Sequence, residues 1–166
     1  VEKVKLDSKE TGGSLFDKLS GVGAALLVKT LDELEKGTVK PVKQNETEAT
    51  HVKMLDKSFG NIDFSMEAAR IERLIRGLNP WPSAFTHFNG KLLKIWDADV
   101  CDDVVCESGE SVVNGMITQV DNNSFIVKCG DNSLKINELQ LEGKKRMKTQ
   151  DFLRGNHINT GDILGK

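Results

Sequence analysis

The chain has 166 residues, a formal net charge of -2 and a pI near 6.0, which excludes the uniformly basic surface of a protein that wraps nucleic acid on all sides. No apolar run approaches the roughly 20 residues that cross a bilayer. The three cysteines and three histidines lack the spacing of a zinc site. We therefore expect free thiols, no bound metal, no membrane partner and a cytoplasmic location.

The first 37 residues have the pattern of a strand followed by a long helix. Residues 1–6 alternate apolar and charged side chains, as an edge strand does. Ser14 stands three residues before Asp17 in a sequence that resembles a capping box, and Gly37 is placed to end the helix. Because one strand and one helix cannot bury the apolar stripe over residues 19–34, we expect a larger domain that begins earlier in the protein. In its absence the segment should be poorly anchored or shielded by a second copy.

Residues 38–59 are polar and show little periodicity, which predicts an extended linker. Ser65 is then placed to cap a second amphipathic helix. Arg70, Arg73 and Arg76 are three residues apart, so they share one face of this helix. Such a face is either solvated or in contact with a partner.

A rigid elbow, Gly-Leu-Asn-Pro-Trp-Pro at residues 77–82, joins this helix to the strands that follow. Asn79 precedes a proline and is biased out of the helical region. The Trp81–Pro82 bond is one of the few places in the chain where a cis peptide is plausible. We expect Trp81 and Pro82 to hold the elbow in the core.

Short strands dominate the remainder of the chain. Asn89-Gly90 is a strong signal for a two-residue hairpin, and Asp121-Asn122-Asn123 lies between two further apolar runs. Four or five short strands at this spacing predict a mainly β domain, either a small barrel resembling an OB fold or a sandwich. Strands are expected over 84–88, 91–98, 115–120, 124–129 and 133–141, with a short helix over 149–153 before a glycine-rich tail.

Common catalytic motifs, including the nucleophile elbow, the Walker loop and the zinc-protease helix, do not occur in the chain. Asp102 and Asp103 in the acidic loop 99–109, with the nearby Glu107 and Glu110, could form a metal loop, although solvated acid explains them without a regular calcium spacing. Residues 159–162 (Asn-Thr-Gly-Asp) are more typical of a fraying tail than of a catalytic loop.

Basic side chains give a clearer signal, since a phosphate backbone needs little more than a basic patch. A solvated turn is the competing explanation for the consecutive cations at 144–146. The candidate RNA-binding residues are Lys57, Arg76, Lys91, Lys94, Lys144, Lys145 and Arg146.

Several stretches resemble, in the same order, the bacterial methionyl-tRNA formyltransferases. Those at 73–82 (Arg-Leu-Ile-Arg-Gly-Leu-Asn-Pro-Trp-Pro) and 139–147 (Leu-Gln-Leu-Glu-Gly-Lys-Lys-Arg-Met) are the most specific. Together with 14–19, 62–65 and 151–155 they span nearly the whole chain. The resemblance implies that residues 1–37 are the remnant of a Rossmann-like N-terminal formyltransferase domain. Residues 38–59 would then be the linker and 60–166 the C-terminal OB-like domain.

The resemblance also implies a function. The intact enzyme would transfer a formyl group from 10-formyltetrahydrofolate to the amino group of methionyl initiator tRNA in translation initiation. The family's catalytic asparagine, histidine and aspartate would lie before Val1, and residues 159–162 only mimic the run that holds the aspartate. We therefore expect this part to contain no catalytic residue and no cofactor, to be inactive alone, and to position RNA for the missing catalytic domain. Its partners would be that domain and initiator methionyl-tRNA, not DNA.

Three other interpretations remain open. The chain could be the C-terminal domain of another folate-dependent formyltransferase, in which the cations at 144–146 are idle. It could be a free-standing OB-type RNA-binding module, which should present aromatic side chains for base stacking. It could also be a purely structural domain.

Overall fold

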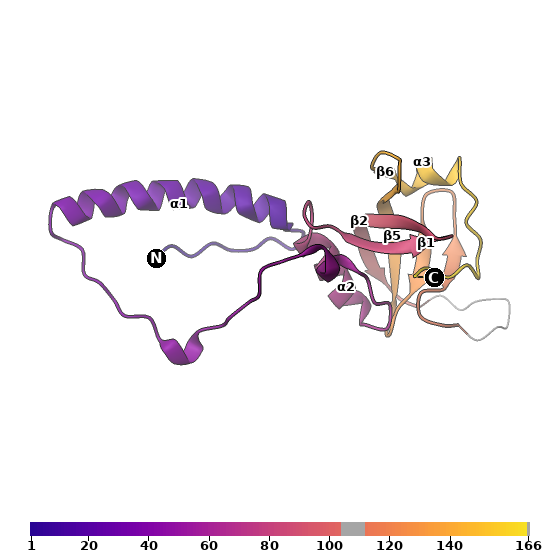
Figure 1. The fold of residues 1–166 in the computed structure, drawn as a ribbon, viewed down its shortest axis with the longest axis horizontal. Coiled ribbons are helices and arrows are strands. Elements are labelled where there is room, and N and C mark those ends of the chain that lie inside the picture. Colours follow the sequence, from indigo (N-terminus) through magenta and orange to yellow (C-terminus); the bar gives the residue numbers. More distant parts are fainter. Residues whose placement is uncertain (104–111, 166) are drawn as a thin grey trace.

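The computed structural model describes residues 1–103 and 112–165, so Cys106 and Glu107 of the acidic loop, and the adjacent Glu110, lie outside the described part. A long helix projects away from a compact β domain, and the chain returns through an extended linker (Figure 1). The helices are α1 (Gly12–Glu35), α2 (Ala68–Gly77) and α3 (Thr149–Leu153), with 3-10 turns η1 (Glu46–Glu48) and η2 (Lys57–Gly60). The strands are β1 (Ala84–Phe88), β2 (Lys91–Cys101), β3 (Ile117–Val120), β4 (Phe125–Lys128), β5 (Ser133–Leu141) and β6 (Met147–Lys148).

The strands form one antiparallel sheet in the order β1-β2-β5-β4-β3, with β6 paired to β5. Asn89 and Gly90 both have positive φ, 50° and 73°, as the predicted two-residue hairpin requires. The β3–β4 hairpin, β5 and α3 also lie where the sequence predicts them. The prediction of a mainly β domain with flanking helices is confirmed. The sheet curls without closing into a barrel by strand pairing within the described residues, so the likeness to an OB fold is loose.

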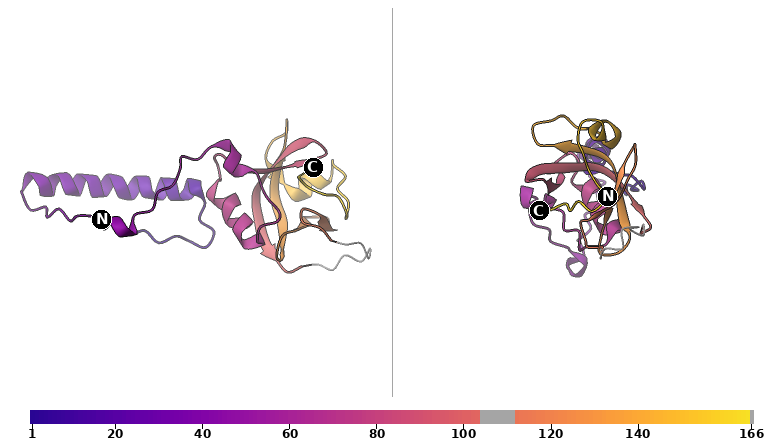
Figure 2. Two further views of the ribbon diagram at one scale, coloured as in Figure 1. Left: turned by 60° about the horizontal axis from the view of Figure 1, so that its bottom comes forward. Right: turned by 90° about the vertical axis from the view of Figure 1, so that its right-hand side faces the viewer.

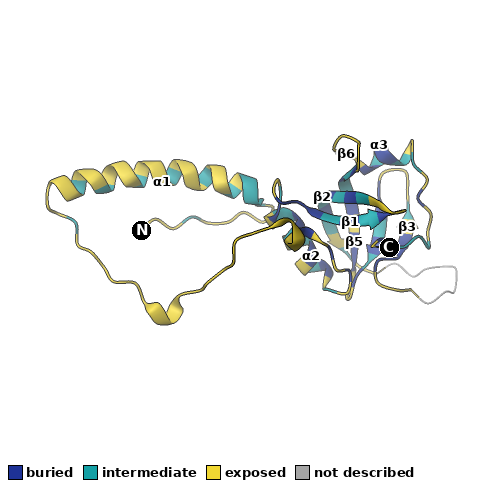
Figure 3. Ribbon diagram, in the orientation of Figure 1, coloured by how far each residue is buried: buried dark blue, intermediate teal, exposed yellow. Residues whose placement is uncertain are grey.

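The core lies between the inner face of this sheet and helix α2 (Figure 2). Leu93 and Ile95 of β2 alternate with outward-facing residues, as a half-buried strand requires. Ile71 and Ile75 cover them from the apolar stripe of α2 and are equally buried. Burial is thereby concentrated in the β domain, while α1 contains no buried residue (Figure 3).

Helix α1 begins three residues earlier than the sequence suggests. Thr11 is the N-cap: its hydroxyl accepts from the Ser14 N–H at 3.1 Å, and the Ser14 hydroxyl accepts from the Thr11 N–H at 3.0 Å. The capping box is therefore Thr11 with Ser14, not Ser14 with Asp17. Gly37, with a φ of 66°, follows the helix end as predicted. Residues 1–6 form no strand, because no neighbouring strand in the described chain pairs with them.

Helix α2 begins at Ala68 and is not capped by Ser65, because its cap comes from far along the chain. The Ala68 N–H donates to the Asp131 carboxylate at 2.9 Å. Ser65 instead donates its backbone N–H to Asp63 in the preceding turn, at 2.9 Å. The observed N-cap position is Glu67, so the local prediction of Ser65 as the cap is wrong by two residues.

The elbow after α2 contains two cis peptide bonds, the predicted one at Trp81–Pro82 and another at Asn79–Pro80. Pro82 is buried as expected, but Trp81 is 60% exposed. Ser83 and Ala84, which follow in the chain, are buried with Pro82, while the indole lies at the surface. The prediction that Trp81 lies in the core is wrong.

The C-terminal tail is pinned to the sheet instead of fraying. Its Leu164 N–H donates to the Gly115 carbonyl next to β3, and its Gly165 N–H donates to the His87 carbonyl of β1, both at 2.9 Å. The tail thus covers the two edge strands, whose backbone groups would otherwise be exposed. Residues 159–162 turn at the start of this segment, where the Asp162 carboxylate accepts from the Asn159 N–H at 2.8 Å.

Replacing Leu164 by alanine should lower the free energy of unfolding by about 2–4 kcal/mol, the usual cost of removing a buried leucine side chain. Leu164 is only 3% exposed. Urea denaturation of the two proteins measures the difference. Val113→Ala is the matched control because Val113 is 45% exposed, and its change should stay within about 0.5 kcal/mol. Equal stability of Leu164→Ala and the unmodified chain would show that the tail is not part of the core.

No helix in the described ranges is long and apolar enough to cross a membrane.

Candidate nucleic-acid interface

The outer face of β2 and β5 is organised around Trp96, which the sequence reasoning did not single out. The strand register shifts between Ile95 and Asp97, so Trp96 lies at a β-bulge. A bulge re-aims the side chain that it contains. The Trp96 N–H donates to the Gln140 side-chain oxygen on β5 at 3.3 Å, which fixes the orientation of the indole ring.

Two of the predicted cations lie over this indole ring. The Lys94 ammonium nitrogen is 5.6 Å from the ring centroid, and the central carbon of the Arg146 guanidinium is 4.8 Å from it. Both distances are within the range of a cation–π contact. Arg146 is also ion-paired with Glu138 of β5. The ring and the carboxylate thus hold a guanidinium group at the surface in a defined position.

We call residues 143–146 the basic turn. It follows β5, and Gly143 supplies a φ of 75° that L side chains rarely adopt. The Gln140 amide donates to the Lys144 carbonyl at 2.9 Å, so the same side chain contacts Trp96 and the turn. Lys144 and Lys145 are exposed and, among the described residues, make no ion pair. The turn therefore presents two solvated ammonium groups beside one fixed guanidinium.

Lys91 lies close to the basic turn at the start of β2. The next residue, Leu92, exchanges backbone and side-chain hydrogen bonds with Glu142, directly before the turn. Lys57 is exposed in η2, which packs against β1, and no contact in the described chain brings it to this face. The structure thus brings together Lys91, Lys94, Lys144, Lys145 and Arg146, but not Lys57.

Arg76 is engaged in internal contacts. Its Nε donates to the Glu72 carboxylate at 2.6 Å, and its Nη1 donates to the Glu10 carbonyl at 2.8 Å. It lines a cleft of about 420 Å³ that also reaches Trp96 and Arg146. Arg76 therefore borders the basic face, but its guanidinium already has protein partners.

The cleft also contains acidic side chains that have partners within the protein. Lys9 lies 2.5 Å from Asp99, and their hydrogen bond lowers the pKa of Asp99 and raises that of Lys9. Asn137 donates to Asp99 at 2.8 Å and to Asp97 at 3.1 Å. The two aspartates of the cleft are thus held in place by hydrogen bonds from Asn137, and the charge of Asp99 is offset by Lys9.

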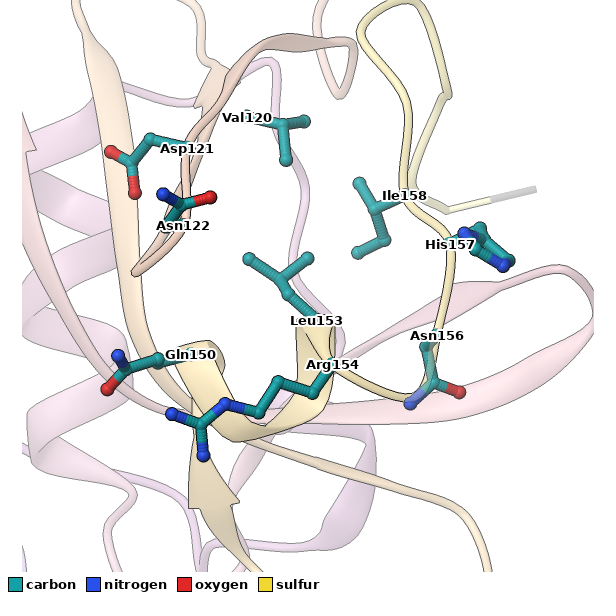
Figure 4. Close-up of a pocket in the computed structure, with 9 residues that line it drawn as sticks. All are labelled: Val120, Asp121, Asn122, Gln150, Leu153, Arg154, Asn156, His157 and Ile158. Atoms are coloured by element: carbon teal, nitrogen blue, oxygen red, sulfur yellow. The ribbon is translucent and has the colours of Figure 1, made fainter.

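A second cavity, of about 500 Å³, lies between the β3–β4 turn and the chain around α3 (Figure 4). Three of its polar side chains make local contacts. Arg154 pairs with Asp151 at 3.0 Å, Asp121 accepts the backbone N–H groups of its own turn, and Asn156 donates to the Phe152 carbonyl. The carboxylate of Asp121 and the guanidinium of Arg154 both have partners, so this cavity has no counterpart to the exposed lysines of the basic turn.

Sequence reasoning could have found Trp96 only in part. Alternation along Lys94-Ile95-Trp96 places Lys94 and Trp96 on the same face of a strand. Their contact with Arg146 depends on pairing of β2 with β5 and on the bulge, neither of which the alternation reveals.

The curled sheet with its flanking helices defines a small β domain of an OB-like class. The model of the family described as "Formyl transferase, C-terminal domain" matches residues 54–157. The chain therefore belongs to this family.

Curated relatives extend the match over the whole chain. The methionyl-tRNA formyltransferase of Lachnospira eligens is 61% identical over 166 residues, which are all of this chain and 53% of that protein. That of Agathobacter rectalis is 49% identical over 97% of this chain and 50% of the relative. The chain thus spans about half the length of these relatives. Among solved structures, a variant of HypX from Aquifex aeolicus shares the fold, with a TM-score of 0.58 and 15% identity over 96% of this chain and 31% of that one.

Proposed function

We propose that this chain is the tRNA-positioning part of a methionyl-tRNA formyltransferase that acts in translation initiation. The longer protein would transfer the formyl group of 10-formyltetrahydrofolate to the amino group of methionyl initiator tRNA. The identity to relatives of that name supports the enzyme class. The observation that supports RNA positioning is the exposed basic turn, whose Arg146 lies over the Trp96 ring and whose Lys144 carbonyl accepts from Gln140.

The proposal divides the chain as the resemblance implies, with the end of the formyltransferase domain at 1–37, a linker at 38–59 and the C-terminal domain at 60–166. Attack of an amine on the formyl carbon needs a polarised carbonyl and a proton acceptor. We assign these groups to the other half of the longer protein, which would work in the cytoplasm. The 166-residue chain alone would bind RNA without formylating it.

The test is a titration of the chain with formylatable initiator tRNA at roughly 50 and 200 mM salt. Binding through several phosphate contacts should weaken steeply between these concentrations, because each contact releases a condensed counterion. A formylation assay of the longer protein with 10-formyltetrahydrofolate tests the reaction itself. Binding that is absent, or independent of salt, would contradict RNA positioning by this face.

The same titration separates this proposal from its rivals. In a C-terminal domain of another folate-dependent formyltransferase the basic turn would have no role in binding tRNA. A purely structural domain would not bind RNA at all. A free-standing OB-type module should hold single-stranded RNA by stacking. In the described part of the outer β2–β5 face, Trp96 is the one aromatic side chain, and it already carries two cations.

Trp96→Leu should weaken the binding of initiator tRNA about fivefold or more, because two released side chains must then be ordered on binding, at roughly 0.5–1.5 kcal/mol each. Leucine retains an apolar side chain but releases Lys94 and Arg146 from their positions over the ring. Trp81→Leu, at the 60% exposed indole of the elbow, is the matched control and should bind like the unmodified chain. Unchanged binding in Trp96→Leu, or an equal loss in both variants, would contradict a positioning role that is specific to Trp96.

A further inference from the structure

The first turn of α1 lies against the C-terminal end of α2. The Gly13 N–H donates to the Asn79 carbonyl at 2.8 Å. A helix leaves its first N–H groups and its last C=O groups without internal partners, and here the chain after α2 supplies an acceptor for α1. The positive end of one helix dipole thereby meets the negative end of another.

The contact is too close for side chains. A Cβ atom on Gly12 would lie 2.4 Å from the Gly77 carbonyl oxygen, and one on Gly13 would lie 2.8 Å from the Pro80 ring. The two glycines of α1 therefore allow the backbones to approach. The glycines further along the same helix, Gly21 and Gly23, face open space.

Charged side chains hold the chain before α1 to the same place. Arg76 joins the Glu10 carbonyl at 2.8 Å to the Glu72 carboxylate at 2.6 Å. Lys9 lies between Asp99 at 2.5 Å and Glu72 at 3.8 Å. The Glu72 side chain is only 12% exposed. Removing one partner of such a half-buried group leaves the other charge without compensation, which is costly.

Beyond its first turn, α1 contains no buried residue and exposes Phe16, Leu27 and Leu31. With 24 residues, it is about 36 Å long. A rotation of about 10° at its N-terminus would move its far end by about 6 Å, from the same rise per residue. The direction of the helix (Figure 1) is therefore set at its N-terminal end.

We infer that Gly12, Gly13, Arg76 and Asn79 form a rigid joint that fixes the direction of α1 relative to the β domain. Resting on the proposed function, the joint also sets where the catalytic half of the longer protein stands relative to RNA on the basic turn. Arg76 is then a positioning residue of the joint. Its guanidinium is needed for the contacts with Glu10 and Glu72, and not for a contact with a phosphate group.

The Gly13 amide reports directly on the joint. At the second position of α1 it has no acceptor within the helix, so its protection from hydrogen exchange depends on Asn79. In the 166-residue chain, Gly12→Ala and Arg76→Ala should each speed the exchange of this amide at least tenfold. Gly23→Ala is the control for Gly12→Ala, because a Cβ atom at Gly23 would meet no other atom within 4 Å. Arg70→Ala is the control for Arg76→Ala, because Arg70 is an exposed arginine of the same helix. Both controls should leave the Gly13 amide protected. Fast exchange in the unmodified chain, or protection retained in Gly12→Ala, would overturn the joint.

The longer protein tests the consequence. Gly12→Ala should lower kcat/KM for formylation of initiator tRNA at least tenfold, while its Kd for tRNA and the activity of Gly23→Ala stay unchanged. Full activity of Gly12→Ala would overturn the positioning role. If the unmodified longer protein formylates no tRNA, the proposed function fails, and the exchange of the Gly13 amide still decides whether the joint exists.

Discussion

Replacing Lys144, Lys145 and Arg146 together by alanine should weaken the binding of initiator tRNA roughly a hundredfold at about 0.15 M salt. Each phosphate contact adds about 0.7 to 0.9 to the slope of log affinity against log salt, which at this concentration corresponds to about a fivefold gain per contact. The triple variant should therefore lose about 2 to 3 units of slope as well as affinity. A titration at several salt concentrations measures both quantities on the same samples.

The matched control removes three positive charges elsewhere. Lys29 lies in α1, Lys36 caps its C-terminal end and Lys40 follows in the linker, so all three lie away from the joint and the β domain. Replacing these three lysines together by alanine changes the net charge by the same amount as the triple variant of the basic turn, and it should leave the salt slope nearly intact. Equal losses in both triple variants would mean that tRNA responds to net charge and not to the basic turn.

The three cations of the turn should not contribute equally. Arg146 is held by Glu138 and by the Trp96 ring, so little side-chain entropy remains to be lost when it meets a phosphate. Lys144 and Lys145 are free to move in solvent. We therefore expect Arg146 to fix the register of a bound RNA, with the two lysines adding charge around it.

Local signals in the sequence predicted most of the β domain. Asn89-Gly90 requires positive φ at both positions, and alternation defines which faces of β1 and β2 are buried, so neither prediction needs distant information. The features that were missed depend on contacts across the chain. Asp131 caps α2 from 63 residues away, and the C-terminal tail gains its order only by covering two edge strands.

The candidate site shows the same division. Lys144, Lys145 and Arg146 are adjacent in sequence, so their proximity on one turn required no fold. Arg76 shares the helical spacing of a solvated face, yet its guanidinium contacts Glu10, 66 residues away. The sequence shows which residues are basic, and their spacing shows which face they share, but neither shows which of them already have partners within the protein.

Gly130→Ala should lower the free energy of unfolding by about 2–4 kcal/mol, through overpacking and the loss of a helix cap. A Cβ atom on Gly130 would lie 2.1 Å from the Ser65 carbonyl oxygen, and the Gly130 N–H donates to the Met66 carbonyl at 2.9 Å. Both contacts are between backbones, so no flexible side chain can move to make room. The loop must shift away from α2, and it takes the Asp131 cap of Ala68 with it.

Two further variants separate these contributions in the same denaturation experiment. Asp131→Ala removes only the cap and should cost about 1 kcal/mol. Gly155→Ala, where the added methyl group meets open space, should change the stability by no more than about 0.5 kcal/mol. The expected order of loss is Gly130→Ala, then Asp131→Ala, then Gly155→Ala. If Asp131→Ala cost as much as Gly130→Ala, the cap alone would hold the loop on α2, and the close backbone approach at Gly130 would contribute nothing of its own.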